Sequence, residues 1–288
     1  MINFMKLRWL YFGISLAVII PGIFSLVRYG LAYSIDFTGG SLLELRAQSG
    51  QVPTLETVKS QVGTDFQIGS VQSSGNGNFI IKGSELTNER KSEVISLLKN
   101  GLGELTELRF ERVGATISQE LVKKTVTGIL IVSIAITIFV TRQFKELRYG
   151  LSAILAMAHD SLVLLGIFSL LGQFQGVQVD VLFVTALLTT LSFSVHDTIV
   201  VFDRIRELRR TFPKERYSLI LNTAVTETLS RSLNNSITII LMLTALVLLG
   251  GESIRMFAVA LLIGAITGTY SSTFTAVPLL LFWERRSK

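Results

Sequence analysis

The chain has 288 residues, of which 49% are hydrophobic and only 17% are charged. A soluble domain carries about 25% charged residues, so this composition excludes an ordinary soluble protein and predicts an integral membrane protein. The net charge of +6 does not indicate a nucleic-acid partner, because the basic residues cluster beside apolar runs. The sequence contains no cysteine, which excludes disulfides, thiolate nucleophiles and metal sites with cysteine ligands.

Six apolar runs are each long enough to cross the roughly 30 Å of hydrocarbon in a bilayer. They cover residues 9–27, 122–140, 150–171, 181–202, 229–249 and 256–283. The first run is longer than the core of a secretory signal peptide, so we expect it to remain as an uncleaved span.

Basic residues mark the connections that we expect in the cytoplasm, by the rule that positive loops stay inside. They follow the second, fourth and sixth runs, and are Arg142, Lys145, Arg148, Arg204, Arg206, Arg209, Arg210, Lys214, Arg216, Arg285, Arg286 and Lys288. The connection over residues 173–180 has no Lys or Arg, which suits the opposite side. Both termini are therefore expected in the cytoplasm.

The segment between the first two runs lacks long apolar stretches and alternates short strands with amphipathic helices. Strands are predicted over residues 41–46, 66–72, 78–82 and 106–112, and helices over residues 54–62 and 87–102. The sequence Ser-Ser-Gly-Asn-Gly at residues 73–77 is typical of a hairpin turn, and Thr87 is a candidate N-cap. The order β-α-β-β-α-β predicts a ferredoxin-like α+β sandwich, with no residue cluster that indicates catalysis.

The predicted fold is thus an α-helical polytopic membrane protein with six transmembrane helices and a ferredoxin-like extracytoplasmic domain inserted between helices 1 and 2. Residues 1–31 form the cytoplasmic N-terminus and the first span, and residues 32–119 form the outer domain. Residues 120–288 form spans two to six and a cytoplasmic tail.

Both histidines of the chain precede an aspartate inside an apolar run. An Asp or Arg at the centre of a span costs about 2.5–3.5 kcal/mol on insertion scales, so each such residue needs a partner. His159 and Asp160, in the third run, are interpreted first as a polar pair that hydrogen-bonds to a neighbouring helix. Adjacent residues point in different directions on a helix, so their role stays open.

Asp197, which follows His196 in the fourth run, continues a polar helical face that holds Thr190, Ser194 and Arg204. The fifth run begins with a matching polar stripe made by Arg231, Asn234, Asn235 and Thr238. We expect Arg231 to be the partner of Asp197, in a site that can carry protons. Two alternatives are a static buried ion pair and an arginine that extends to the lipid headgroups.

Two further patterns favour structural interpretations. The sixth run has a small-residue face that permits close helix approach, made by Gly264, Gly268, Ser271, Ser272 and Thr275. The loop after the first run, formed by Asp36, Phe37, Thr38, Gly39 and Gly40, lacks the Lys-Ser/Thr of a phosphate loop and is interpreted as a glycine turn. No metal-ligand spacing or hydrolase pattern is present, so we expect no catalytic residue, metal or cofactor.

Several motifs resemble those of one known family. They are residues 36–40, residues 113–118 before the second span, His159-Asp160, residues 194–207 at the end of the fourth span, residues 228–232 and Gly250-Gly251. In these segments, which span nearly the whole chain, the sequence resembles the SecF family. That family is the smaller half of the SecDF accessory complex of bacterial protein export, within the resistance-nodulation-division superfamily.

The resemblance implies a protein-export subunit of the bacterial cytoplasmic (inner) membrane that uses the proton motive force, and not an enzyme. Asp197 and Arg231 would belong to a proton pathway formed with a SecD partner. His196 stands where many relatives have Asn and would be a further titrating group. Supporting polar residues would be Asp160, His159, Ser194, Asn235 and Thr238. Other implied partners are the SecYEG channel with YajC as a further candidate, the unfolded polypeptide in transit and membrane lipid, and no nucleic acid is implied.

The resulting hypothesis is that a proton neutralises Asp197, loosens its pairing with Arg231 and shifts the helices, so that the outer domain pulls on emerging polypeptide. One alternative is a small-molecule or lipid exporter subunit of the same superfamily, which would usually need two six-span halves on one chain. Another is a purely structural subunit, which would be indifferent to mutation of the buried charges.

Overall fold

The computed structural model describes residues 3–286 apart from residues 49, 51, 64–65, 76 and 145. The chain forms two compact units. The α/β unit comprises Tyr33–Val126, and the helical unit comprises Met1–Ala32 together with Thr127–Lys288.

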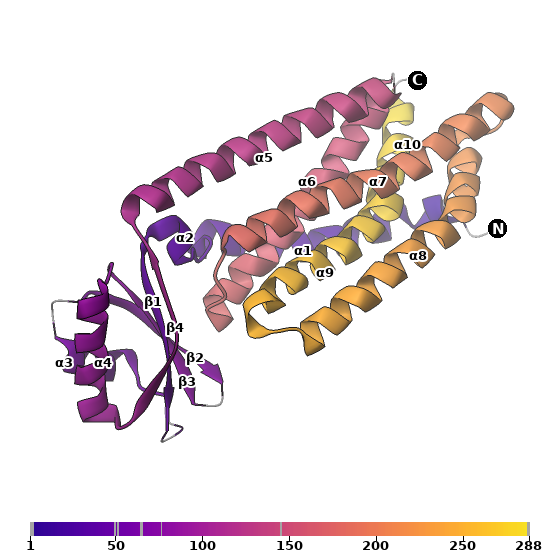
Figure 1. Ribbon diagram of the computed structural model, residues 1–288. Coiled ribbons are helices and arrows are strands. Elements are labelled where there is room, and N and C mark those ends of the chain that lie inside the picture. Colours follow the sequence, from indigo (N-terminus) through magenta and orange to yellow (C-terminus); the bar gives the residue numbers. More distant parts are fainter. Residues whose placement is uncertain are drawn as a thin grey trace. The chain divides into compact units, whose positions relative to one another are not determined.

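The α/β unit contains a four-stranded sheet with strand order β2-β3-β1-β4, and every neighbouring pair is antiparallel. Its elements are α2 (Ile35–Thr38), β1 (Gly40–Ala47), α3 (Leu55–Val62), β2 (Ile68–Gly75), β3 (Asn78–Gly83), α4 (Asn88–Leu102) and β4 (Leu105–Val113). Helices α3 and α4 lie on one face of the sheet (Figure 1). This confirms the predicted ferredoxin-like sandwich.

Local sequence signals account for these elements. Thr54 and Thr87 are the N-caps of α3 and α4, and the side chain of Thr87 accepts a hydrogen bond from the backbone N–H of Arg90, as predicted. β2 and β3 pair on either side of the expected hairpin turn, where Asn76 lies outside the described residues. Alternate residues of the strands meet the helices in one apolar core, which includes Leu43, Leu45, Val58, Phe79, Ile81, Val94 and Leu98.

The loop of residues 36–40 is a turn that only glycine can complete. The short helix α2 ends at Gly39 with φ of 72°, and Gly40 begins β1 with φ of 116°. A Cβ on Gly40 would overlap the carbonyl oxygen of Gly83 in the paired strand β3. A Cβ on Gly39 would lie 3.3 Å from the hydroxyl of Ser118, so this loop packs against the segment that leads into the second span.

The helical unit contains the membrane spans. Its elements are the 3-10 helix η1 (Phe4–Leu7), α1 (Arg8–Tyr29), α5 (Ala115–Phe144, which begins in the α/β unit), α6 (Leu147–Gln175), α7 (Val181–Thr211), α8 (Tyr217–Leu249), α9 (Glu252–Ser271), the π-helix η2 (Ser272–Ala276) and α10 (Val277–Arg286). Within the described residues, six helical stretches are long and apolar enough to cross a membrane. Each contains one of the six predicted spans and extends beyond it, most of all α8, which begins at Tyr217 and not at residue 229.

Helix α9 contacts α6, α7 and α8 (Figure 1). The helical unit contains a large hydrophobic core that includes a cluster of aromatic rings. The ring of Phe202 lies 5.4 Å from that of Phe144 and 5.3 Å from that of Tyr149. Helix α5 joins the core through its last turns, at Val140 and Phe144.

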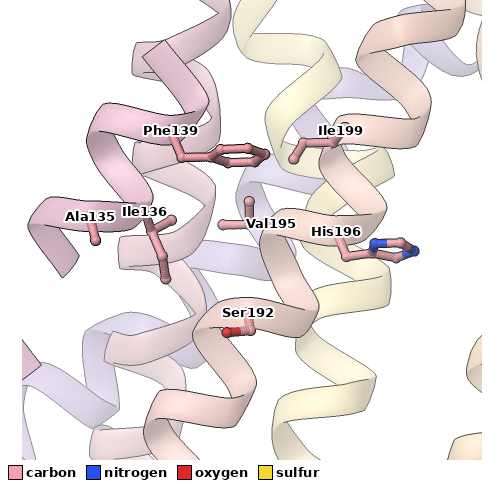
Figure 2. A pocket seen from close by; sticks show the side chains of 7 residues that line it. All are labelled: Ala135, Ile136, Phe139, Ser192, Val195, His196 and Ile199. Carbon is pink, nitrogen blue, oxygen red and sulfur yellow. The ribbon is translucent and has the colours of Figure 1, made fainter. Parts of the chain in front are cut away.

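Next to this core, α5 and α7 border a cavity of about 390 Å³. Figure 2 shows Phe139 of α5 reaching toward Ile199 of α7, while His196 points away from α5. Most apolar side chains of α5 face outward within the single chain, so this span is the least packed of the six.

Helices α1 and α6 cross at two glycines, where a Cβ on Gly166 would lie 2.6 Å from the Cα of Gly22. One turn further, the hydroxyls of Ser25 and Ser169 hydrogen-bond at 2.7 Å. Small residues thus allow the first span to reach α6 closely enough for polar contacts.

Gly166→Ala should therefore force α1 and α6 apart and lower the free energy of unfolding by about 1–3 kcal/mol. Titration of the full chain from mild detergent into SDS, followed by circular dichroism, would measure this loss. Gly128→Ala is the matched control, because a Cβ there meets no atom within 4 Å. Equal stability of the two variants would contradict the close crossing.

Gly40→Ala should destabilise the pairing of β1 with β3 by about 1–3 kcal/mol, because the methyl group meets the Gly83 carbonyl and the backbone has a positive φ. Hydrogen exchange of the β1 and β3 amides in the full chain would report the change. Gly30→Ala separates the two causes, since Gly30 also has a positive φ of 72° but no atom within 4 Å.

Candidate functional site

Asp197 is buried between α7 and α8, with 3% of its surface exposed. The hydroxyl of Ser232 on α8 donates a hydrogen bond of 2.8 Å to its Oδ2 atom. Within the part of the chain that the structure describes, no salt bridge to Asp197 is present. A single hydroxyl thus holds a carboxyl group inside a membrane span.

Arg231 does not form the contact with Asp197 that the sequence led us to expect. It precedes Ser232 on α8, but its side chain is exposed and lines a polar groove of about 590 Å³ between α7 and α8. In this groove Arg204 of α7 forms an ion pair of 2.6 Å with Glu227 of α8. On a helix, residues next to each other point in different directions, so Ser232 can face Asp197 while Arg231 faces the groove.

The polar face N-terminal to Asp197 packs against the small-residue face of α9. Thr190 lies against Gly264, and a Cβ on Gly268 would lie 3.3 Å from the Cα of Ser194. Both side chains are almost completely buried, yet neither hydroxyl has a hydrogen-bond partner among the described residues. The small residues of the sixth span therefore permit close helix approach, as predicted, and leave polar atoms in the contact.

His159 and Asp160 make a buried network that joins three helices. His159 Nδ1 lies 2.9 Å from Asp160 Oδ1, and its Nε2 lies 3.0 Å from the hydroxyl of Ser15 on α1. On the other side, the hydroxyl of Ser271 on α9 donates a 2.6 Å hydrogen bond to Asp160 Oδ2. The pair thus bonds to neighbouring helices, as interpreted, although adjacency on one helix did not lead us to expect the contact between its two members.

Among the described residues, none of the remaining predicted residues hydrogen-bonds to these two networks, although His196 is next to Asp197 and close enough to interact with its charge. His196 is exposed on α7, and Asn235 and Thr238 are exposed on α8. The loop of residues 36–40 belongs to the α/β unit. Within the described residues, no group of three or more His, Cys, Asp or Glu side chains could hold a metal ion.

Three hydroxyls that complete the networks were not assigned from the sequence. Ser232 follows Arg231, Ser271 was assigned only to helix contact, and Ser15 was not singled out. Serine is common in membrane spans, so no periodic signal marked these three. Only the helix rotations bring each hydroxyl to its carboxylate or imidazole.

Both networks contain a carboxyl group that can hold or release a proton while its hydroxyl donor stays in place. Carboxyl groups buried in a span in this way are typical of proton pathways in pumps and transporters. Ser15, His159 and Asp160 are linked in the order of a Ser-His-Asp triad, but all three side chains are buried inside the spans, where proton binding is the chemistry that they support best.

Comparison with known proteins agrees with this geometry. The family model described as protein export membrane protein SecD/SecF, C-terminal, matches residues 93–286, and the SecD/SecF GG motif matches residues 24–51, which include the glycine turn. The SecF protein translocase subunit of Anaerolinea thermophila is 39% identical, over 99% of this chain and 94% of that protein. The SecDF subunit of Thermus thermophilus is 36% identical over 90% of this chain, which spans only 35% of it.

Comparison with solved structures points to the same family. The crystal structure of SecDF from Thermus thermophilus matches 99% of this chain with a TM-score of 0.85 and 32% identity, and the matched part is 39% of the SecDF chain. These relatives are protein translocase subunits and not enzymes. The chain, a multi-pass membrane protein, therefore belongs to the SecF family of protein-export subunits.

Proposed function

We propose that this SecF-family chain uses proton movement through its helical unit to promote polypeptide translocation across the cytoplasmic membrane, together with a SecD partner. The observation that carries the proposal is Asp197, a buried carboxyl group that a single hydroxyl holds and no described cation neutralises. An ionised carboxylate in such a place is costly, so binding and release of a proton would change the stability of the α7–α8 contact.

Energy for movement would come from the proton gradient. Each proton that falls through the membrane potential supplies about 2.3 kcal/mol per 100 mV, which biases a two-state arrangement of helices. Protonation of Asp197 would weaken its attraction for the Ser232 hydroxyl, and α8 could then rotate or shift along α7. Arg231, in the adjacent groove, would favour the ionised form of Asp197 whenever such a shift brings it closer.

The orientation of the chain follows from its loop charges. We propose that the groove with Arg204 and Arg231 opens to the cytoplasm, where the basic loops and both termini would lie. The α/β unit would then lie outside, where the resemblance places the emerging polypeptide, SecYEG and YajC as the partners available to it. The boundaries of the outer domain that we predicted, residues 32–119, stay within this proposal.

SecD is the partner that would complete the membrane part. Asn234 and Asn235 are exposed on α8 in the single chain, yet this stretch lies inside a span. Lipid cannot satisfy such polar groups, so they must meet water or another protein. In the Thermus thermophilus relative the matched region is about one third of a longer SecDF chain, which supports SecD as the protein that covers this face.

Asp197→Asn tests the proton site, because it keeps the size of the side chain and removes its ability to ionise. We expect the stimulation of precursor export by the membrane potential to fall at least about tenfold, since 1.4 kcal/mol already corresponds to a factor of ten. Export into inverted membrane vesicles, with and without an uncoupler and at equal protein level, would measure it.

Glu215→Gln, in the exposed connection between α7 and α8, is the control for loss of one carboxylate. Arg231→Met is also expected to reduce the dependence of export on the membrane potential. Arg216→Met, which removes an arginine just before the start of α8, is its control. Export that keeps its full potential dependence in Asp197→Asn would sink the proton-coupled function and favour a structural subunit.

Asn234→Leu with Asn235→Leu tests the partner. The double variant makes this face suitable for lipid, so we expect at least a roughly tenfold weaker association with SecD, equivalent to about 1.4 kcal/mol. Co-purification from mild detergent after equal co-expression would measure the change. Met242→Leu, an exposed apolar position on the same helix, should leave the complex intact, and unchanged recovery of SecD with the double variant would show that this face is not the contact.

A further inference from the structure

The function proposed above uses Asp197 and leaves a second buried acid unexplained. Asp160 has none of its surface exposed and lies in the third span, beside His159, of which 8% is exposed. Among the described residues, His159 is the only side chain that could carry a positive charge and that contacts Asp160. A buried carboxylate with a titratable neighbour is costly unless a proton neutralises the pair.

The described side chains that contact this pair from other helices belong to α1 and α9 and are all neutral at ordinary pH. Helix α1 contributes the Ser15 hydroxyl to His159, and its Tyr11 carbonyl accepts a 2.7 Å hydrogen bond from the Tyr270 hydroxyl. Helix α9 contributes Ser271 to Asp160, and Tyr270, whose ring stacks on His159 with centroids 6.2 Å apart. The charge of the pair therefore depends on its own proton.

The hydrogen bonds fit both protonation states of His159. With a proton on each nitrogen, the ring donates from Nδ1 to Asp160 and from Nε2 to Ser15. After loss of the Nε2 proton, the Nδ1 bond stays and the Ser15 hydroxyl can turn to donate to Nε2. No heavy-atom contact has to break, so the pair can exchange one proton at little structural cost.

Asp160 lies at about the same depth along the bundle of spans as Asp197. Thr190 lies against Gly264, and four residues further along both helices Ser194 lies near Gly268. Helices α7 and α9 therefore run parallel, and residues equally far along the two helices lie at the same depth. One more turn brings Asp197 level with Ser271, whose hydroxyl bonds Asp160. Directly after Ser271, α9 continues as the π-helix η2, a form that occurs often at functional sites.

Hydroxyls without partners lie within about one turn of this level at Ser194 and Thr275, and about two turns away at Ser152 and Thr190. Four buried side chains on α6, α7 and η2 lack a hydrogen-bond partner among the described residues, and they are Ser152, Thr190, Ser194 and Thr275. Native interiors leave few such atoms, and internal water usually satisfies them. Water between the helices that contact α9 would satisfy these hydroxyls.

We propose that His159 and Asp160 form a second proton-binding site, and that water held by the buried hydroxyls of α6, α7 and η2 connects this site to Asp197. The proposal rests on the proton-coupled function above. A proton would pass from Asp197 through water near Ser194 to the Ser271 hydroxyl, which accepts it on one side while donating its own to Asp160. Because His159 bonds Ser15, the charge of the pair would also act on α1, the span that leads into the α/β unit.

The two histidines of the chain make a direct test possible. Solid-state NMR of the full chain, labelled with ¹⁵N-histidine in bilayers of phosphatidylethanolamine and phosphatidylglycerol, reports the protonation of each ring. His196→Gln assigns the two sets of signals. We expect the His159 nitrogens to change protonation between about pH 5 and 8, and the midpoint to move by roughly half a pH unit in Asp197→Asn.

Two serines of α7 provide a matched pair for the connection. Ser194→Ala removes a buried hydroxyl and should also move the His159 midpoint, whereas Ser192→Ala removes an exposed one and should leave it unchanged. A His159 ring that keeps one protonation state throughout this pH range in the wild-type chain would overturn the second site. If His159 titrates but its midpoint is the same in the wild-type chain, in Asp197→Asn and in Ser194→Ala, the proposed connection to Asp197 is wrong.

These readouts do not depend on export. A static His159 ring together with export that is lost in Asp197→Asn would refute the second site and leave the proposed function standing. A titrating, coupled His159 ring in a chain whose export ignores Asp197→Asn would support the second site and refute its proposed use.

Discussion

A polar side chain inside hydrocarbon must find its partners within the protein, and the helical unit is arranged around this constraint. Asp160 binds α6 to α9 through Ser271, and His159 extends the link to α1 through Ser15. Asp197 binds α7 to α8 through Ser232. One network thereby links α1, α6 and α9, and the other links α7 and α8, each contact between two helices being a single hydrogen bond.

Small residues make these links possible. The hydroxyls of serine are short, so a serine reaches a carboxylate only if the two helix backbones lie close together. Gly264 and Gly268 allow α9 to approach α7, and Gly22 and Gly166 do the same for α1 and α6. Bulkier residues at Gly22 or Gly166 would separate α1 from α6, and with them the Ser15 hydroxyl from His159.

The α/β unit is tied to the spans by the chain itself, since Tyr33 follows the end of α1 and α5 begins directly after β4. Both junctions come together within this unit, where Gly39 packs against Ser118. The glycine turn matched by the SecD/SecF GG motif and the segment before the second span therefore form one structure.

The sequence by itself determined the number and order of the spans, the ferredoxin-like order of the α/β unit and the two acid positions, because each follows from a local pattern. Apolar length predicts a span, alternation and caps predict strands and helices, and Asp160 and Asp197 interrupt apolar runs whatever surrounds them. Family motifs such as residues 36–40 could be read in the same way.

Only the tertiary structure decided which side chains meet the acids. Arg231 has the stronger charge and a compatible depth, yet the neighbouring Ser232 faces Asp197, and a rotation of one residue along α8 separates the two outcomes. The same holds for Ser15 and Ser271, which come from helices far from Asp160 in sequence. Helix rotation about its axis is fixed by contacts along its whole length, and no local pattern of residues carries that information.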